Sequence, residues 1–303
     1  MKYLVTGVCG QLGHDVMLEI SRRGHKAVGS DVSPAYSGIL QDAVAQMPYI
    51  SLDITDKAAV ERVLISQAPD VVLHCAAWTN VDLAEEDVHR QTVFSVNADG
   101  TRHIALACKA LGCKMIYIST DYVFGGQGDQ PFSPDSTDFA PLNVYGQSKL
   151  EGEKAVRAAL EKYFIVRIAW VFGSNGKNFV KTMLNLGKKY DTLRVVCDQI
   201  GTPTYTPDLA RLLVDMSETE KYGTYHATNE GGYINWYDFA CEIFRQAGIS
   251  VCTLPVSTAE YGLSKAVRPC NSRLDKSKLK ENGFEPLPAW QDALDRYLKE
   301  TEV

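Results

Sequence analysis

Residues 1–13, MKYLVTGVCGQLG, decide the fold of this chain. An apolar run, Tyr3–Thr6, is followed by three glycines with the spacing G-x-x-G-x-x-G, and a helical pattern then begins. Glycine lets the backbone turn sharply and approach a pyrophosphate, while the N-terminus of the next helix offers free N–H groups. The alternative is a tight strand–helix turn without a ligand. We expect a dinucleotide to bind this loop through Gly7, Gly10, Gln11, Leu12 and Gly13.

Short apolar runs alternate with amphipathic stretches through the first 170 residues, which indicates parallel strands joined by crossover helices. The expected strands are Tyr3–Thr6, Ala27–Ser30, Tyr49–Leu52, Val71–Cys75, Met115–Ser119 and Phe164–Ile168. The expected helices are Gln11–Arg22, Lys57–Gln67, Val96–Leu111 and Tyr145–Leu160. The predicted fold class is therefore α/β, a Rossmann-type doubly wound parallel sheet that binds ligands at the carboxyl ends of its strands.

The alternation of strands and helices loosens after residue 170. A strand is expected at Leu193–Cys197 and helices at Asp208–Ser217 and Trp236–Ala247, with frequent proline and glycine near the end. We predict a dinucleotide-binding domain at 1–170 and a smaller C-terminal lobe at 171–303. This lobe mainly binds substrate, and some of its segments return to the first domain.

Acidic residues end the second and third expected strands. Asp31 stands 18 residues beyond Gly13, where a carboxylate accepts hydrogen bonds from an adenosine ribose and repels a 2′-phosphate, so NADH is favoured over NADPH. Asp53 is placed to bind an adenine amino group, with Ile54 packed on the ring, or alternatively to cap the following helix. Cys75, Ala76 and Ala77 end the fourth strand, and their small side chains leave room for the cofactor.

Tyr145 and Lys149 open a long helical pattern with the spacing that places both side chains on one face. An ammonium group stabilises a phenolate and lowers the tyrosine pKa, so that the phenol can exchange a proton with a carbonyl or alcohol oxygen. Thr120, after the fifth strand, can donate a hydrogen bond to the same oxygen. We predict that Tyr145, Lys149 and Thr120 are the catalytic residues, with Tyr145 and Lys149 also contacting the cofactor.

Bulk properties exclude several classes of protein. The 303 residues carry a formal net charge of −6, which argues against nucleic-acid binding. No apolar run is long enough to span a bilayer and no signal peptide is visible, so a cytoplasmic location without membrane binding is expected. The eight cysteines contain no C-x-x-C pair, and Glu85, Glu86 and Asp87 are interpreted as a solvated helix face rather than a metal site.

Together these motifs resemble the extended short-chain dehydrogenases/reductases, over nearly the whole chain. Within them, several strings resemble the dTDP-4-dehydrorhamnose reductases: Val5–Gly7 with Gly10–Gly13, Leu52–Asp56, Ala76–Asp82, Val96–Ala98, Ile118–Gly125, Tyr145–Lys149 with Gly152 and Glu153, Arg167–Gly173, Gly201–Thr204, and Arg268 and Pro269 with Asn271 and Ser272. The resemblance implies NAD(P)H-dependent reduction of the 4-keto group of dTDP-4-dehydro-L-rhamnose, with Tyr145 as proton donor. It also implies that Thr120, Asp121 and Trp170 contact the sugar. Cys9 departs from the family pattern, which often has a small polar residue there.

Two other functions stay open at this point. A nucleotide-sugar epimerase or dehydratase would retain its NAD, although the acidic pair that follows the threonine in related dehydratases is here Asp121-Tyr122. A non-catalytic regulatory subunit of the methionine adenosyltransferase type is the second alternative. The expected partner is a nucleotide sugar, and a homodimer is possible.

Overall fold

Seven parallel strands form the central sheet of the computed structural model, which describes residues 1–301. Their order is β11-β6-β5-β4-β1-β2-β3, so the chain moves outward in opposite directions from β1 and leaves a crevice beyond the ends of β1 and β4. The bounds are β1 Lys2–Thr6, β2 Lys26–Asp31, β3 Tyr49–Ser51, β4 Val71–His74, β5 Lys114–Thr120, β6 Tyr163–Ile168 and β11 Gly223–His226. The predicted Rossmann-type sheet is confirmed.

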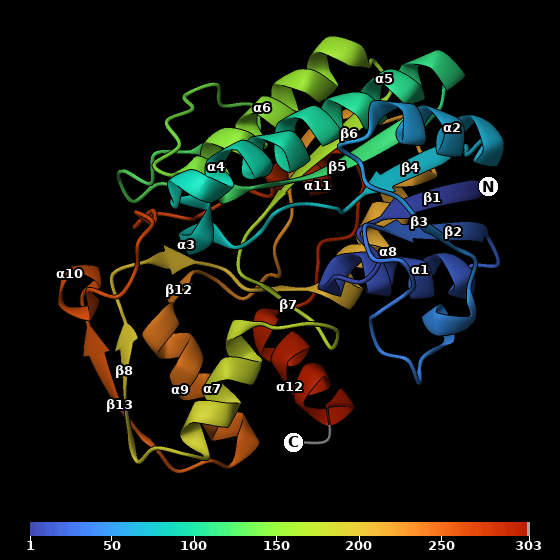
Figure 1. Ribbon diagram of the computed structural model, residues 1–303. Coiled ribbons are helices and arrows are strands. Elements are labelled where there is room, and N and C mark those ends of the chain that lie inside the picture. The colour runs from blue at the N-terminus through green and yellow to red at the C-terminus, as the bar shows by residue number, and fades with distance from the viewer. Residues whose placement is uncertain (302–303) are drawn as a thin grey trace.

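Helices cover both faces of this sheet (Figure 1). On one face lie α2 (Lys57–Gln67), α5 (Thr101–Leu111) and α6 (Val144–Ala159), and on the other lie α1 (Gln11–Arg22), α8 (Thr206–Ser217) and α11 (Ser277–Glu281). Successive residues of a strand point to opposite faces, so Tyr3 and Val5 join the core under α1 and α8, while Leu4 joins the core under α2 and α5. Burial on both faces explains why the central strands are apolar throughout.

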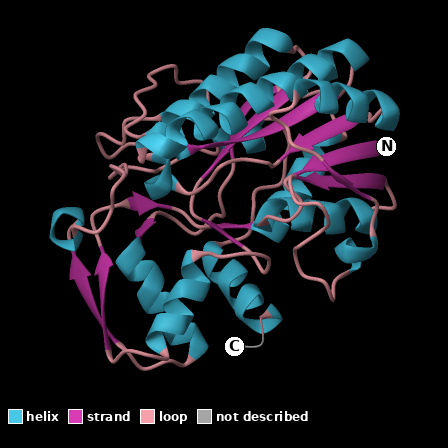
Figure 2. Ribbon diagram, viewed as in Figure 1, coloured by secondary structure: helices cyan, strands magenta, loops and turns pink. Residues whose placement is uncertain are grey.

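A smaller lobe lies below the carboxyl ends of the sheet (Figure 2). Its core is strongly aromatic and includes Phe172, Tyr205, Phe239, Trp290 and Tyr297. Its strands pair as β7 (Val171–Phe172) with β10 (Thr204–Tyr205), β8 (Thr192–Val196) with β13 (Cys252–Val256), and β9 (Ile200–Gly201) with β12 (Ile234–Asn235). Its helices are α7 (Phe179–Gly187), α9 (Trp236–Ala247), α10 (Thr258–Tyr261) and α12 (Trp290–Glu300).

Segments beyond residue 170 also contribute to the central sheet and to the helices that cover it. Strand β11 pairs with β6 at the edge of the central sheet, and α8 packs on α1. The division of the chain at residue 170 stays a prediction, and the last two residues of its second part, 302–303, lie outside the described residues.

The elements predicted from the sequence lie close to those of the structure, except for the helix expected at Val96–Leu111. The helix expected at Val96–Leu111 begins as a π-helical segment, Ser95–Gly100, and becomes α-helical only as α5. Several elements were not predicted, including α7, α12, β11 and β13. Helices α3 (Val81–Ala84) and α4 (Asp87–Phe94) were also missed, because they are short and Val93 is the one buried side chain of α4. Among residues 1–301, no helix has both the length and the apolar character needed to cross a membrane.

Candidate active site

The loop after β1 is built on backbone contacts that only glycine permits. A Cβ on Gly13 would lie 2.3 Å from the carbonyl oxygen of Gly7, and a Cβ on Gly7 would lie 2.6 Å from the backbone nitrogen of Ala76. Gly7 also adopts φ +75°, which L side chains rarely adopt. The first turn of α1 therefore packs directly on the ends of β1 and β4. Gly10 is its N-cap and makes no side-chain hydrogen bond, so the first N–H groups of α1 remain available to an anion.

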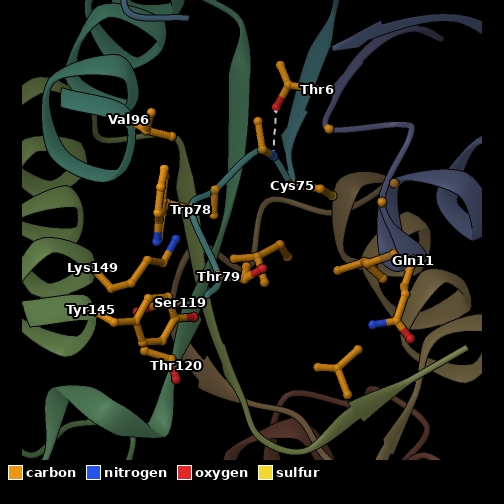
Figure 3. A pocket seen from close by; sticks show the side chains of 18 of the residues that line it. Thr6, Gln11, Cys75, Trp78, Thr79, Val96, Ser119, Thr120, Tyr145 and Lys149 are labelled. Carbon is orange, nitrogen blue, oxygen red and sulfur yellow. Dashed lines mark hydrogen bonds between the residues drawn. The ribbon is translucent and has the colours of Figure 1, made fainter. Parts of the chain in front are cut away.

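A cavity of about 1200 Å³ opens at the carboxyl ends of the central strands. Figure 3 shows Gln11 of the glycine loop on one side of this cavity and Tyr145 and Lys149 on the opposite side. The structure thus brings together residues from segments far apart in the sequence. Every residue predicted for the site lines the cavity: Gly7, Gly10, Gln11, Leu12, Gly13, Asp31, Asp53, Ile54, Cys75, Ala76, Ala77, Thr120, Asp121, Tyr145, Lys149 and Trp170.

Tyr145 stands in the first turn of α6, and this turn is capped twice. The Asn143 side chain accepts a hydrogen bond from Gly146 N at 2.8 Å, and Glu85 Oε1 accepts one from Val144 N at 2.7 Å. Side-chain oxygens at this position satisfy N–H groups that the helix itself leaves unpaired. The interpretation of Glu85 as part of a solvated helix face was wrong, because its carboxylate fixes the start of the helix that carries Tyr145.

Burial shifts the pKa values of Tyr145 and Lys149 in opposite directions. It raises the pKa of the Tyr145 phenol, with Asp121 adding to the rise and Thr120 opposing it through a side-chain hydrogen bond. It lowers the pKa of Lys149 to about 7, with the charge of Glu153 acting against the fall. The sequence predicted a lowered pKa for Tyr145, but Lys149 is not among the groups that shift it. Burial therefore favours the protonated form of the Tyr145 phenol.

Thr120 and Asp121 form a linked pair at the end of β5. Thr120 Oγ1 donates a hydrogen bond to Asp121 Oδ1 at 2.9 Å and accepts one from Tyr122 N at 3.2 Å. The second carboxylate oxygen of Asp121 is buried and has no hydrogen-bond partner. Burial raises the pKa of Asp121 to about 6, against the lowering effect of Ser272 and Thr120. Asp121 can therefore hydrogen-bond a polar ligand group inside the cavity.

Asp31, which was predicted to bind the adenosine ribose, hydrogen-bonds the backbone of the glycine loop. Its Oδ2 accepts a hydrogen bond from Cys9 N at 3.0 Å and its Oδ1 accepts one from Val32 N at 2.8 Å. Asp53 instead binds Thr55, accepting from its N at 2.9 Å and from its Oγ1 at 2.7 Å. The cap of α2 is Asp56, so the alternative role of Asp53 as the helix cap is wrong. Both Asp31 and Asp53 still line the cavity.

Sequence reasoning missed two side chains that shape the site, Asn97 and Trp236. Asn97, in the π-helical segment, donates to Ser148 Oγ at 2.9 Å and to Trp78 O at 3.1 Å, and its Oδ1 accepts from Trp78 N at 2.8 Å. It thereby ties the loop after β4 to α6. Trp236 stacks on Trp170 with ring centroids 3.6 Å apart, and both rings line the cavity. Nothing in the linear sequence pairs these positions.

Glu85, Glu86 and Asp87 do not form a metal site. Within residues 1–301, no group of three or more His, Cys, Asp or Glu side chains could hold a metal ion. Glu86 pairs with Lys265 Nζ at 2.6 Å instead. His74 is a core residue, hydrogen-bonded to Thr6 Oγ1 at 2.7 Å and to Thr101 Oγ1 at 3.1 Å.

Comparisons with known proteins identify the family of this chain. The sequence matches the family described as RmlD substrate binding domain over residues 1–303. This chain belongs to that family. It is 40% identical, over 299 residues, to the dTDP-4-dehydrorhamnose reductase of Streptomyces griseus, covering 97% of this chain and 91% of the relative. The resemblance to dTDP-4-dehydrorhamnose reductases predicted from the motifs is confirmed.

Solved structures of the family have the same fold. The dTDP-4-dehydrorhamnose reductase of Bacillus anthracis, in complex with NADP, superposes with a TM-score of 0.89 at 39% identity, covering 99% of each chain. The corresponding protein of Clostridium acetobutylicum gives a TM-score of 0.90 at 39% identity and covers 100% of each chain. The similarity extends over both lobes.

Proposed function

We propose that this chain uses NAD(P)H to reduce the 4-keto group of dTDP-4-dehydro-L-rhamnose to dTDP-L-rhamnose. The observation that carries the proposal is that Tyr145 and Lys149 face the glycine loop across one cavity. Relatives covering nearly the whole chain are named for this reduction. The remaining steps are derived from the residues of this chain.

The cavity fits a nicotinamide dinucleotide. The glycine contacts described above bring the backbone and the free N–H groups of α1 to the cavity wall, where a pyrophosphate would bind. Asp31 lines the cavity and would accept hydrogen bonds from the adenosine ribose, which favours NADH, although the relative from Bacillus anthracis was solved with NADP. Lys149 has a buried side chain and would hold the second ribose. When bound, the cofactor supplies the hydride.

Tyr145 would donate the proton that completes the reduction. Its raised pKa keeps the phenol protonated until an alkoxide develops on the substrate oxygen, which is then the stronger base. Thr120 would turn its single hydroxyl proton from Asp121 Oδ1 to the same oxygen and orient it. Such positioning of reacting groups contributes much of the rate acceleration in enzymes.

The nucleotide part of the substrate would extend into a second cavity of about 310 Å³. Trp236 lines both cavities, so the second one lies next to the first. Arg194 lines the second cavity and supplies positive charge suited to a diphosphate, while Arg268, also in the lining, is paired with Asp82 Oδ2 at 2.7 Å. The sugar would then lie between the Trp170 ring and Tyr145.

The two alternative functions have less support. Dehydration needs an acid and a base beside the sugar, but Tyr122 follows Asp121 where a second carboxylate is required. An epimerase would show retained NAD without net oxidation of NADH. A regulatory subunit needs no active site, whereas Tyr145, Lys149 and Thr120 are all present and line one cavity. The cytoplasmic location and the homodimer stay predictions.

The decisive experiment is an NADH-oxidation assay with dTDP-4-dehydro-L-rhamnose. Parallel reactions contain NADPH in place of NADH, or a UDP-linked keto-sugar in place of the dTDP sugar. We expect stoichiometric oxidation with the dTDP sugar and a slower reaction with the UDP sugar. No oxidation of either cofactor with the dTDP sugar would refute the proposal, and size-exclusion chromatography of the same sample tests the dimer.

A further inference from the structure

Glu153 is a buried carboxylate two turns beyond Tyr145 on α6. Its side chain is 1% exposed, and Arg167 on β6, its main partner, is 0% exposed. Arg167 Nε donates to Glu153 Oε1 and Arg167 Nη2 donates to Glu153 Oε2, each at 2.8 Å. Arg157 adds a bond to Oε2 at 2.9 Å. Burying an ion pair is costly unless its hydrogen bonds are complete, and here both carboxylate oxygens are satisfied.

The same carboxylate also reaches the strand that ends in Thr120. Ser119 Oγ donates to Glu153 Oε1 at 2.6 Å. Tyr117 lies two residues earlier on β5 and therefore faces the same side of the sheet. Its ring centroid is 4.1 Å from Lys149 Nζ, and its hydroxyl donates to Lys149 O at 3.2 Å. Helix α6 is thus fixed to β5 at two points one turn apart, which sets its rotation about its own axis.

Lys149 has several titratable neighbours among the described residues. Tyr145 shares its helix face, Tyr117 lies beneath it on β5, and His74 and Cys75 approach from the end of β4. Burial lowers the pKa of Lys149, and Glu153 is the largest opposing influence, followed by Cys75. His74 is uncharged at neutral pH, because burial lowers its pKa to about 3.

Glu153 itself stays ionised. Burial acts to raise its pKa, but Arg167, Ser119 and Arg157 outweigh burial and hold the pKa below its usual value. His226 on β11 contacts the arginine of this ion pair, with its Nε2 3.2 Å from Arg167 Nη1. Burial and the charge of Arg167 keep the pKa of His226 well below its usual value. Glu153 is therefore ionised at neutral pH, beside the positive charges of Arg167 and Arg157.

We propose that Glu153 is a positioning residue that fixes α6 on β5 and supplies the negative charge that stabilises the Lys149 ammonium. The proposal rests on the proposed roles of Tyr145 and Lys149 in cofactor binding and proton transfer. The buried Glu153–Arg167 ion pair would then support the function of Lys149 in addition to joining α6 to β6.

The test is the pH dependence of NADH binding, measured by fluorescence titration without sugar. Glu153→Gln keeps the size of the side chain and removes its charge. Lys149 should then lose its proton at lower pH, so the midpoint at which NADH affinity falls on raising pH should move down by about 1 pH unit or more. Glu153→Asp restores the charge and should return the midpoint toward the wild-type value. The kcat for keto-sugar reduction should fall in Glu153→Gln more than KM changes.

Arg157→Gln is the matched control. It removes the partially exposed arginine from the same carboxylate but leaves the buried Arg167 pair intact, so its pH midpoint should equal that of the wild type. Glu153→Gln leaves Arg167 charged and buried, which endangers folding. The double variant Glu153→Gln/Arg167→Gln removes both charges and provides a second folded sample, confirmed by thermal unfolding.

The outcomes separate the two proposals. A downward midpoint shift in either folded variant, with rescue by Glu153→Asp, supports the role of Glu153. An unchanged midpoint in folded Glu153→Gln, even with lower stability, overturns it, because a merely structural ion pair would not change the charge of Lys149. If the wild type binds NADH but reduces no keto-sugar, the proposed function fails while the binding midpoints still decide the role of Glu153.

Discussion

Replacing Gly13 with alanine tests the glycine loop most directly. The added methyl group would lie 2.3 Å from Gly7 O, 2.7 Å from Gly7 C and 2.9 Å from Val8 Cα. All three atoms belong to the backbone, so no flexible side chain can move aside. Relief requires α1 to move away from the end of β1, which displaces the N–H groups proposed to bind the pyrophosphate. Overpacking of this kind costs roughly 1–3 kcal/mol, which corresponds to about 5- to 150-fold in affinity at about 1.4 kcal/mol per tenfold.

The assay for Gly13→Ala is NADH binding by fluorescence titration, together with thermal unfolding. Gly24→Ala is the matched control, because Gly24 has φ +72°, has nothing within 4 Å of its added Cβ, and lies outside the cavity. The control should lose about 1 kcal/mol of stability through backbone strain and keep wild-type affinity for NADH. If Gly13→Ala bound NADH as tightly as the control, NADH binding would not depend on the close approach of α1 to β1, and the reasoning would be refuted.

Four further outcomes are expected. Tyr145→Phe should bind NADH normally and lose roughly 10²–10⁴-fold in turnover, since it lacks the proton donor; a near-normal rate would exclude that role. Asp31→Ala should raise the NADPH:NADH ratio of kcat/KM, and an unchanged ratio would remove Asp31 from the ribose site. Trp170→Ala should impair keto-sugar turnover more than NADH affinity, whereas equal losses would indicate a core residue. Asp15 is buried, which raises its pKa from 3.8 to about 7, so folding binds a proton and stability falls as pH rises through that window. Asp15→Asn should therefore increase the melting temperature above pH 7 but not below pH 4, and a pH-independent difference would contradict this.

The sequence predicted the parts of the site that lie on regular elements. The glycine loop, the strand ends at Asp31 and Cys75, and the Tyr145–Lys149 spacing follow from strand and helix periodicity, because parallel strands bring their carboxyl ends to one edge. The supporting contacts could not be predicted. Asn97 lies within a helical pattern, and its hydrogen bonds to Trp78 and Ser148 depend on a π-helical segment that no periodicity reveals.

The protonation states of Tyr145 and Lys149 also could not be predicted from the sequence. The i, i+4 spacing suggested that Lys149 lowers the pKa of Tyr145, whereas burial determines the pKa of each group in the folded chain. Burial depends on how α6, β4 and β5 pack, and a linear pattern does not give that. The same limit applies to Trp236, which meets Trp170 only because α9 packs across the second lobe.

The return of residues 206–226 to the central sheet has a consequence for protein engineering. Helix α8 shields the apolar face of α1, and β11 covers the hydrogen-bonding edge of β6. A contiguous exchange of the second half with a relative would import a foreign α8 and β11 into the host's own sheet. Chimaeras designed to swap sugar preference should therefore use several crossover points and keep 206–226 with its native sheet, so that specificity is transplanted without rebuilding the cofactor scaffold.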